Sequence, residues 1–400
     1  MHVLIASQYF RPEAGATQNR LGTFADGLIQ RGHTVTVVCE QPNHPGGVFH
    51  PGFGRRPLMT ERDGALTIHR TWVATSPRKT TARRLAFYGT YAGGAAALTL
   101  AARRADVLFA TSPPLPGALG AAAAARARRL PYVLDVRDIW PAAAEALGEL
   151  SDGRVLRAFE RAERWLYRNA ACVTATTRPF CRHIDAVAGR EVSAHLPNGA
   201  LDELVELPPL VASGDGPFTI GYAGNFGIAQ GLGIVLDAAD ELRDEDVRFV
   251  LVGGGPLNEE MREQRERRRL TSVQMRAGIP AAQVGDFLLS CDALLVPLRD
   301  HPLLEDFIPS KLYDAMAVGR PVLVAARGEA AALVREHGCG LEVAPEDGMQ
   351  LAQAVRTLMA DRGLSQRLGD AGKRAASSYA RSRQVVRLEQ ILLETVSDRG

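Results

Sequence analysis

The sequence predicts an α/β protein built from two doubly wound, Rossmann-like domains. Short runs rich in β-branched residues alternate with Ala- and Leu-rich helical stretches along the 400 residues. This alternation is typical of a parallel sheet covered by helices. The pattern stops at a turn-rich segment and then starts again. The length supports the same division, because single cores stop growing at about 250–300 residues.

In the first half, the expected elements begin with a strand that starts at the second residue. The Ala-rich stretch 92–102 is apolar but short, about eleven residues against the ~20 that span a bilayer, so it predicts a helix that is buried or faces a membrane. We expect strands at 2–6, 34–38, 66–70, 107–110, 132–136 and 172–175, helices at 21–31 and 117–129, and a variable loop at 41–64.

A turn-rich segment, 196–217, marks the expected domain boundary. It contains Pro208-Pro209 and Gly214-Asp215-Gly216. Beyond it we expect strands at 218–222, 248–252, 272–275, 293–297, 322–325 and 340–343, followed by a closing helix at 384–396.

The net charge of +2 hides an asymmetry between the two halves. Residues 1–200 carry 25 Arg and Lys against 15 Asp and Glu, whereas residues 201–400 carry 22 against 30. A basic first half suits an anionic acceptor or an anionic membrane surface; the alternative is that these charges only solvate helix surfaces. The contributors are Arg55, Arg56, Arg78, Lys79, Arg83, Arg84, Arg103, Arg104, Arg126, Arg128 and Arg129.

The five cysteines are scattered and show neither CxxC nor Cys/His ligand spacing. This pattern predicts a reducing cytosol and no structural metal. The chain starts directly with a strand and shows no basic-then-apolar leader, so we expect no export. We therefore expect a cytoplasmic protein, with peripheral contact at the inner membrane face as an option and no nucleic-acid partner.

The strongest functional signal is a loop that runs into a helix at Ile308-Pro309-Ser310-Lys311. Ser310 stands where an N-cap is expected, and the free N–H groups and dipole of a helix N-terminus favour an anion such as a diphosphate. Lys311, one of only three lysines, adds a positive charge. Asp314 follows one turn later and could accept from both hydroxyls of a ribose. The alternative is an ordinary amphipathic helix with a Ser cap.

This segment resembles a known family. Its pattern Pro-Ser-Lys-x-x-acid-x-Met-Ala-x-Gly-x-Pro-Val is similar to the C-terminal donor motif of the retaining nucleotide-sugar glycosyltransferases of family four, which have the GT-B architecture. That family has two acidic residues eight positions apart, which correspond here to Asp306 and Asp314. The resemblance assigns Asp314 to the ribose and Asp306 to the transferred sugar, although Glu305 could take the second role.

Two segments of the first half also resemble this family. Gly15 and Ala16 precede a helix, where small residues let backbone approach a phosphate; a plain turn is the alternative. Many members carry His-Asp where this chain has Arg137-Asp138, so the resemblance places Arg137 near the donor sugar as a permanent charge that cannot act as a base. A structural ion pair between Arg137 and Asp138 is the alternative. The segments 111–114 and 135–141 resemble the subgroup that adds amino sugars in O-antigen and capsule assembly.

In the second half, two glycine-rich loops follow expected strands. Their backbone N–H groups could surround a diphosphate. Family members often carry Arg and Lys in the first loop, where this chain has Ile228 and Gln230. The positive charge that neutralises the diphosphate must then come from elsewhere, which makes Lys311 more important. The residues expected to bind the donor here are Gly224, Asn225, Phe226, Gly227, Gly253, Gly254, Gly255 and Pro256, with Arg276 near the base.

The resemblance implies a retaining transferase that moves a hexose or N-acetylhexosamine from a nucleotide diphosphate, most simply UDP. The acceptor would be a polyprenyl-diphosphate-linked saccharide or a small natural product. No cofactor or metal is expected, because Lys311 and the helix N-terminus would stabilise the leaving phosphate. We expect an acceptor domain at 1–196, a linker at 197–217, a donor domain at 218–376 and a helix at 377–400 that returns to the first domain, the domains facing a cleft.

Two other functions stay open. A nucleotide-sugar 2-epimerase shares this architecture but is expected to carry acid/base carboxylates and histidines around the sugar. A non-catalytic sugar-nucleotide-binding paralogue would explain the departures from the family at Arg137, Gln230 and the two aspartates.

Overall fold

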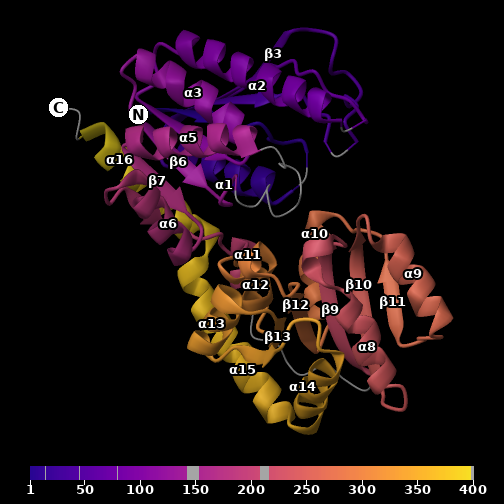
Figure 1. Cartoon of the computed structure of the whole chain (residues 1–400). Coiled ribbons are helices and arrows are strands. Elements are labelled where there is room, and N and C mark those ends of the chain that lie inside the picture. The colour runs from indigo at the N-terminus through magenta and orange to yellow at the C-terminus, as the bar shows by residue number, and fades with distance from the viewer. Residues whose placement is uncertain (14, 45, 79, 142–152, 208–215, 398–400) are drawn as a thin grey trace. The chain divides into compact units, whose positions relative to one another are not determined.

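The computed structural model describes residues 1–13, 15–44, 46–78, 80–141, 153–207 and 216–397. The chain divides into two compact units, Met1–Pro197 with Gln384–Gly400 (unit 1) and Asn198–Arg383 (unit 2). Each unit contains one largely parallel sheet flanked by helices, so the predicted α/β class is confirmed (Figure 1). Lys79, Pro208-Pro209 and Gly214-Asp215 lie outside the described residues.

The sheet of unit 1 has eight strands in the order β3-β4-β2-β1-β5-β6-β7-β8. All neighbours are parallel except β3, which pairs antiparallel with β4 at the edge. Strand β3 falls in the segment that was expected to be a loop, and short β8 was not expected at all. The strands are β1 (His2–Ala6), β2 (Thr34–Glu40), β3 (Leu58–Asp63), β4 (Leu66–Thr71), β5 (Val107–Ser112), β6 (Tyr132–Val136), β7 (Cys172–Ala175) and β8 (Ser193–His195).

The helices of unit 1 cover this sheet. The apolar stretch at 92–102 is the second half of a longer helix, α2, which buries Tyr91, Ala95 and Thr99. Among the described residues, no helix is both long and apolar enough to cross a membrane. The helices are α1 (Ala16–Gln30), α2 (Thr81–Ala101), α3 (Leu115–Ala127), α5 (Gly153–Asn169), α6 (Arg178–Ala188) and α16 (Arg381–Ser397).

Helix α16 returns to unit 1 and completes its core. Leu388 and Leu392 are fully buried there in a cluster that includes Phe24 and Leu28 of α1. The carboxylate of Glu389 accepts from the Arg31 guanidinium at 2.5 Å and lies 2.7 Å from His33 Nε2. Apolar packing and an ion pair therefore both hold the last helix to the first domain.

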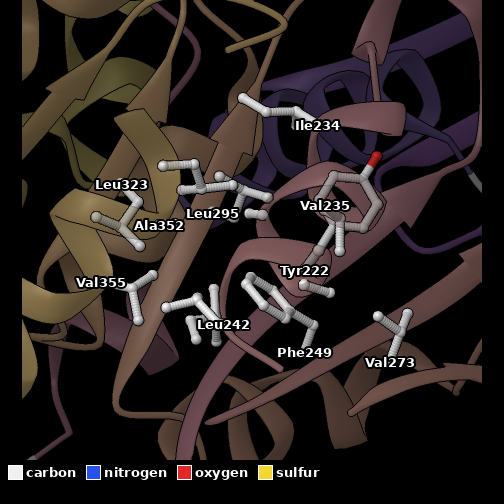
Figure 2. Packing of buried hydrophobic residues seen from close by; sticks show 14 of the residues in the cluster. Tyr222, Ile234, Val235, Leu242, Phe249, Val273, Leu295, Leu323, Ala352 and Val355 are labelled. Carbon is white, nitrogen blue, oxygen red and sulfur yellow. The ribbon is translucent and has the colours of Figure 1, made fainter. Parts of the chain in front are cut away.

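The sheet of unit 2 has six parallel strands in the order β11-β10-β9-β12-β13-β14. One face packs a cluster around Tyr222, Val235 and Phe249 (Figure 2), and the other packs a cluster with residues of α12. The strands are β9 (Phe218–Asn225), β10 (Val247–Gly254), β11 (Val273–Arg276), β12 (Ala293–Pro297), β13 (Val322–Ala325) and β14 (Gly340–Val343).

The segment expected as a linker begins inside unit 2, where Ala200 pairs with Ala380 and a short helix, α7, follows. The helices of unit 2 are α7 (Asp202–Val205), α8 (Gly233–Glu241), α9 (Asn258–Arg267), α10 (Ala281–Leu289), α11 (Pro302–Glu305), α12 (Ser310–Ala317), α13 (Gly328–His337), α14 (Gly348–Ala360) and α15 (Arg362–Ala376), with 3-10 turns at Ile228–Gln230 and Ser377–Tyr379.

Candidate functional site

Two glycine loops lie side by side at the carboxyl ends of β9 and β10. The strands are parallel and pair Gly224 with Gly253 and Asn225 with Gly254. Gly253 has a φ of 149°, and a Cβ at this position would lie 1.9 Å from the Gly224 carbonyl oxygen. Only glycine fits such an approach, so the predicted glycine residues do bring two backbone turns together. Ligands of open parallel sheets bind at this edge.

Phe226 joins the two loops and packs into the core of unit 2. Its backbone N–H donates to the Gly254 carbonyl at 2.9 Å, and its side chain is fully buried in the core. The N–H is therefore used to join the two loops and is not available to a diphosphate. The amide is engaged in this way because the parallel ladder continues one residue beyond the strands, and the donor-binding role of Phe226 stays a prediction.

Lys311 lies beside the first glycine loop. Its Nζ donates to Tyr222 Oη at 2.7 Å and lies 3.9 Å from the centre of the Tyr222 ring. Tyr222 Oη in turn donates to the Asn225 carbonyl at 2.6 Å. A Cβ on Gly224 would lie 2.7 Å from Nζ, so the loop backbone closes over the amine. Figure 2 shows the ring of Tyr222 with its hydroxyl pointing away from Phe249 and Leu242.

Burial controls the charge of this lysine. Desolvation lowers the pKa of Lys311 to about 7, because an ammonium loses its hydration in this position. Among the residues that the structure describes, no carboxylate forms an ion pair with Lys311. A partly buried, desolvated amine next to two glycine loops, with no ion-pair partner in the described part of the chain, is well suited to meet an anion that arrives with a ligand.

Asp314 lies one turn further along α12. Burial raises the pKa of its carboxyl group, and Oδ1 accepts from the backbone N–H of Leu201 at 3.1 Å. One carboxylate oxygen is therefore already engaged with the start of unit 2.

The expected N-cap at Ser310 is wrong. Helix α12 begins at Ser310 itself, and Pro309 occupies the cap position with φ −60° and ψ 135° and no side-chain cap bond. Proline in this extended conformation precedes the helix and starts it one residue earlier than a Ser cap would. The Ile308 side chain is buried in the core with Leu312 and so anchors the loop, and its role toward the donor stays a prediction.

The two acidic residues before α12 are exposed. Glu305 ends the short helix α11 and Asp306 follows it directly. The Glu305 carbonyl packs closely on Gly328, where a Cβ would lie 2.0 Å away, so the backbone here is fixed while both carboxylates face solvent. The contact of Asp306 or Glu305 with the transferred sugar stays a prediction.

The remaining donor-loop residues lie at the same strand ends. Asn225, Gly254, Gly255 and Pro256 are exposed, whereas Gly227 is buried against the Asn225 side chain. Arg276 ends β11, is exposed and donates to Gln274 Oε1 at 2.8 Å.

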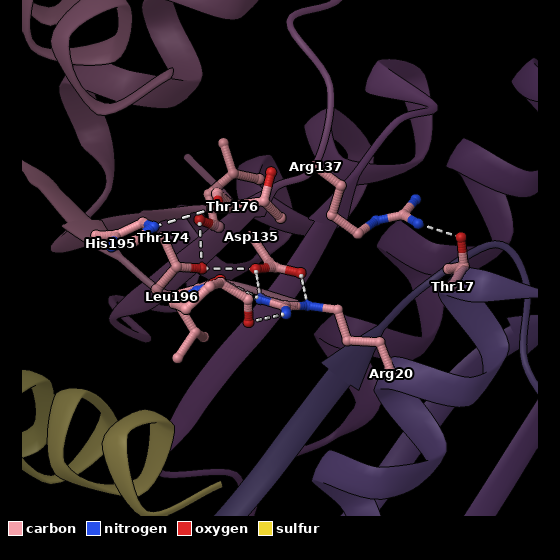
Figure 3. A network of polar contacts seen from close by, with 10 residues as sticks. Thr17, Arg20, Asp135, Arg137, Thr174, Thr176, His195 and Leu196 are labelled. Atoms are coloured by element: carbon pink, nitrogen blue, oxygen red, sulfur yellow. Dashed lines mark hydrogen bonds and ion pairs between the residues drawn. The ribbon is translucent and has the colours of Figure 1, made fainter. Parts of the chain in front are cut away.

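In unit 1, the structure joins Arg137 to the loop that contains Gly15 and Ala16. Arg137 follows β6 and donates to Thr17 Oγ1, in the first turn of α1, and to the Pro113 carbonyl at 3.0 Å (Figure 3). Burial lowers the pKa of Arg137 and raises the pKa of Asp138. The charges of Arg137 and Asp138 also act on each other, each favouring the charged form of its neighbour, although no ion pair joins these two described residues.

A second polar network lies beneath Arg137. Arg20 of α1 and Asp135 of β6 form a buried ion pair with Nη2 and Oδ1 3.0 Å apart (Figure 3). Thr174 Oγ1 donates to the same Oδ1 at 2.8 Å. The Arg20 guanidinium also donates to the carbonyls of Leu196 and Pro197, both at 2.9 Å. This network holds Leu196 and Pro197 in place, and these are the residues after which the chain passes from unit 1 into unit 2.

The sequence reasoning missed Tyr222. The only available signal was a tyrosine in an apolar strand just before a glycine loop. For metal ligands, the described part of the chain contains no group of three or more His, Cys, Asp or Glu side chains that could hold an ion.

Comparison with known proteins supports a single class. Residues 15–199 match the family model "Glycosyl transferase 4-like domain", and residues 209–375 match "Glycosyl transferases group 1". WcaI of Escherichia coli K12, named as a colanic acid biosynthesis glycosyl transferase, is 25% identical over 82% of this chain and 83% of its own length. WbjE of Pseudomonas aeruginosa, named as a glycosyltransferase, is 26% identical over 64% of this chain and 67% of its own.

Solved structures share the fold. Sucrose-phosphate synthase from Thermosynechococcus elongatus has a TM-score of 0.74 at 15% identity, with 99% of both chains covered. Anabaena HepE, solved with UDP and glucose, has a TM-score of 0.69 at 20% identity, again with 99% of both chains covered. The two family models thus place the chain among the glycosyltransferases, and the solved structures share its GT-B fold.

Proposed function

We propose that the chain is a retaining, metal-independent glycosyltransferase that transfers a hexose or N-acetylhexosamine from a UDP-sugar. The observation that carries the proposal is the buried Lys311 amine, held against Tyr222 and covered by Gly224. HepE, which shares the fold, has been solved with UDP and with UDP-glucose. The name of WcaI, which refers to colanic acid biosynthesis, supports an acceptor from polysaccharide assembly.

In this proposal, the UDP diphosphate lies at the glycine loops and meets Lys311. The anion raises the pKa of the lysine again and so restores the ammonium. As the bond from the sugar to the phosphate breaks, negative charge builds up on the leaving phosphate, and the ammonium stabilises it. The leaving phosphate receives the proton of the acceptor hydroxyl, so no protein base is required for a front-side reaction.

Other residues would position the substrate. Asp314 would accept from the ribose hydroxyls through the oxygen that does not bond Leu201, and Asp306 or Glu305 would contact the sugar. The roles toward the donor that are expected for Arg137 and Asp138 remain predictions. The acceptor would be a lipid-linked saccharide or a small natural product.

The test is incubation with a panel of UDP-sugars, with and without acceptor. Release of UDP only with acceptor, and a product that keeps the anomeric configuration of the donor by NMR, would support the proposal. An epimer formed without acceptor, or binding of UDP-sugar without any turnover, would contradict it.

Lys311→Ala should then lower kcat about 100-fold or more, the effect of losing one group that stabilises transition-state charge. The matched control is Lys373→Ala, which removes another partly buried lysine of unit 2 whose Nζ donates to the Ala317 carbonyl at 3.1 Å. This control should keep its kcat. Near wild-type kcat in Lys311→Ala would refute the role of the lysine.

A further inference from the structure

One pocket is lined entirely by residues of unit 1. It is a cavity of about 180 Å³ between the loops that follow β2 and β4 and the first turns of α2. Strands β2 and β4 are parallel neighbours, so both loops leave the sheet at its carboxyl edge. This is the edge at which α/β sheets bind ligands.

The pocket is strongly basic. Arg78, Arg83 and Arg84 contribute to its wall, and none of its described lining residues is acidic. Ser76 helps to fix this wall, because its Oγ accepts from Arg83 Nη1 at 2.8 Å and from the backbone N–H of Arg78 at 3.2 Å. Three guanidinium groups around a small cavity are the arrangement that proteins use for phosphate.

The opposite wall is a preformed polar network around Asn43. Its backbone N–H donates to Glu13 Oε1 at 2.7 Å, and its Nδ2 donates to Glu40 Oε1 at 2.6 Å. Its Oδ1 accepts from Thr75 Oγ1 at 2.8 Å. Glu40 lies behind this wall, and burial raises the pKa of its carboxyl group, which favours the neutral form. Asn43 therefore has a fixed position without a ligand.

Size and surroundings limit what can enter. Pockets for drug-sized ligands have volumes of about 300–1,000 Å³, so this cavity suits one phosphate or diphosphate group and not a whole saccharide. Phe87 and Tyr88 line the same pocket, and the neighbouring Leu85 is 56% exposed on α2. An apolar strip beside a phosphate-sized basic pocket matches a ligand that carries a phosphate next to an apolar chain.

We infer that this pocket binds the phosphate or diphosphate group of the acceptor, so that the enzyme acts on phosphate-bearing acceptors. The inference rests on the proposed glycosyl transfer and adds the chemical class of its acceptor. A lipid diphosphate and a soluble sugar phosphate share this chemistry.

Binding of inorganic pyrophosphate in the presence of saturating UDP tests the pocket directly. The Arg83→Ala/Arg84→Ala variant should raise the Kd for pyrophosphate at least about tenfold, since hydrogen bonds to charged groups are among the strongest. The matched control is Arg103→Ala/Arg104→Ala, an exposed arginine pair just beyond the other end of α2. The control should bind pyrophosphate like the wild type. Equal effects of both double variants, or no pyrophosphate binding by the wild type, would overturn the inference.

Kinetics with three acceptors of the same sugar separate the sources of phosphate: a long-chain alkyl diphosphate, a simple sugar phosphate and a neutral alkyl glycoside. In Arg83→Ala/Arg84→Ala, KM should rise for the phosphorylated acceptors and stay unchanged for the neutral one. A lower KM for the alkyl diphosphate than for the sugar phosphate would support a lipid source, and equal values a soluble source. Equal KM for all three acceptors in the wild type would overturn the inference. UDP binding is measured separately and reports whether the donor site itself is intact. A failure of the proposed function can therefore be distinguished from a failure of the inference about the pocket.

Discussion

Binding of UDP should be accompanied by uptake of a proton at Lys311. In the ligand-free protein the pKa of this lysine is about 7, so at pH 8 about 90% of the molecules carry a neutral amine. A diphosphate beside Nζ favours the ammonium and raises the pKa. We therefore expect uptake of about 0.9 proton per UDP at pH 8 and about 0.5 at pH 7.

Isothermal titration calorimetry in buffers with different ionisation enthalpies measures this number. At pH 8 the terminal phosphate of UDP is already ionised, because its pKa is about 6, so it does not contribute. Lys311→Met should bind UDP more weakly and without proton uptake, whereas Lys373→Met should behave like the wild type. Absence of uptake at pH 8 in the wild type, or uptake that persists in Lys311→Met, would refute the reasoning.

The same burial makes a prediction for stability. The folded-state pKa of about 7 lies below the ordinary value of 10.5, so the unfolded chain binds more protons between these two pH values and stability rises with pH through this window. At and below about pH 7 the full cost applies, up to about 5 kcal/mol. Lys311→Met should therefore raise the free energy of unfolding at pH 7, and the gain should shrink toward pH 10. Chemical denaturation at several pH values measures it, and a destabilised Lys311→Met at pH 7 would contradict this account.

Further predictions concern other parts of the chain. Asp314→Asn should weaken UDP binding, since an amide accepts less well from two hydroxyls, whereas Asp306→Asn should lower transfer and spare UDP affinity; equal losses by calorimetry would contradict this division. Transfer should persist in EDTA, and a requirement restored only by added metal would contradict a metal-independent mechanism. Arg20→Met should lower the unfolding free energy by about 3–5 kcal/mol, because it leaves a buried carboxylate unpaired; a loss below about 1 kcal/mol in denaturant melts would refute this. Binding to anionic vesicles should fall between 0.1 and 1 M salt as screening increases, and Arg83→Glu/Arg84→Glu should weaken it; no binding at low salt would remove support for a membrane contact.

Strands whose apolar residues are buried on both faces were predicted closely. The ranges 132–136 and 172–175 agree with β6 and β7, since a parallel strand inside a sheet is a continuous β-branched run. Strand β3 has the sequence LMTERD and lies at an exposed edge, so its pattern is that of a polar loop. Only pairing with β4, which is a tertiary contact, makes it a strand.

The candidate site was predictable where it depends on local sequence. Two glycine-rich segments and a lysine at the start of a helix point to loops at strand ends. The partner of Lys311 could not be found in this way, because Tyr222 is 89 residues away and the sheet register brings them together. The assignment of Ser310 as a cap failed because Pro309 starts the helix one residue earlier.

The return of α16 to unit 1 has a consequence for biosynthesis. Unit 2 is one continuous segment, 198–383, whereas unit 1 consists of two segments separated by all of unit 2. The apolar side chains of α1 that pack on Leu388 and Leu392 lack this cover until the ribosome has translated the last helix. At ~5–20 residues per second, the time between the synthesis of α1 and the synthesis of α16 is roughly 20 to 70 s. The first domain to be synthesised is thus the last to finish its core, and a chaperone that shields α1 during translation would act in this interval.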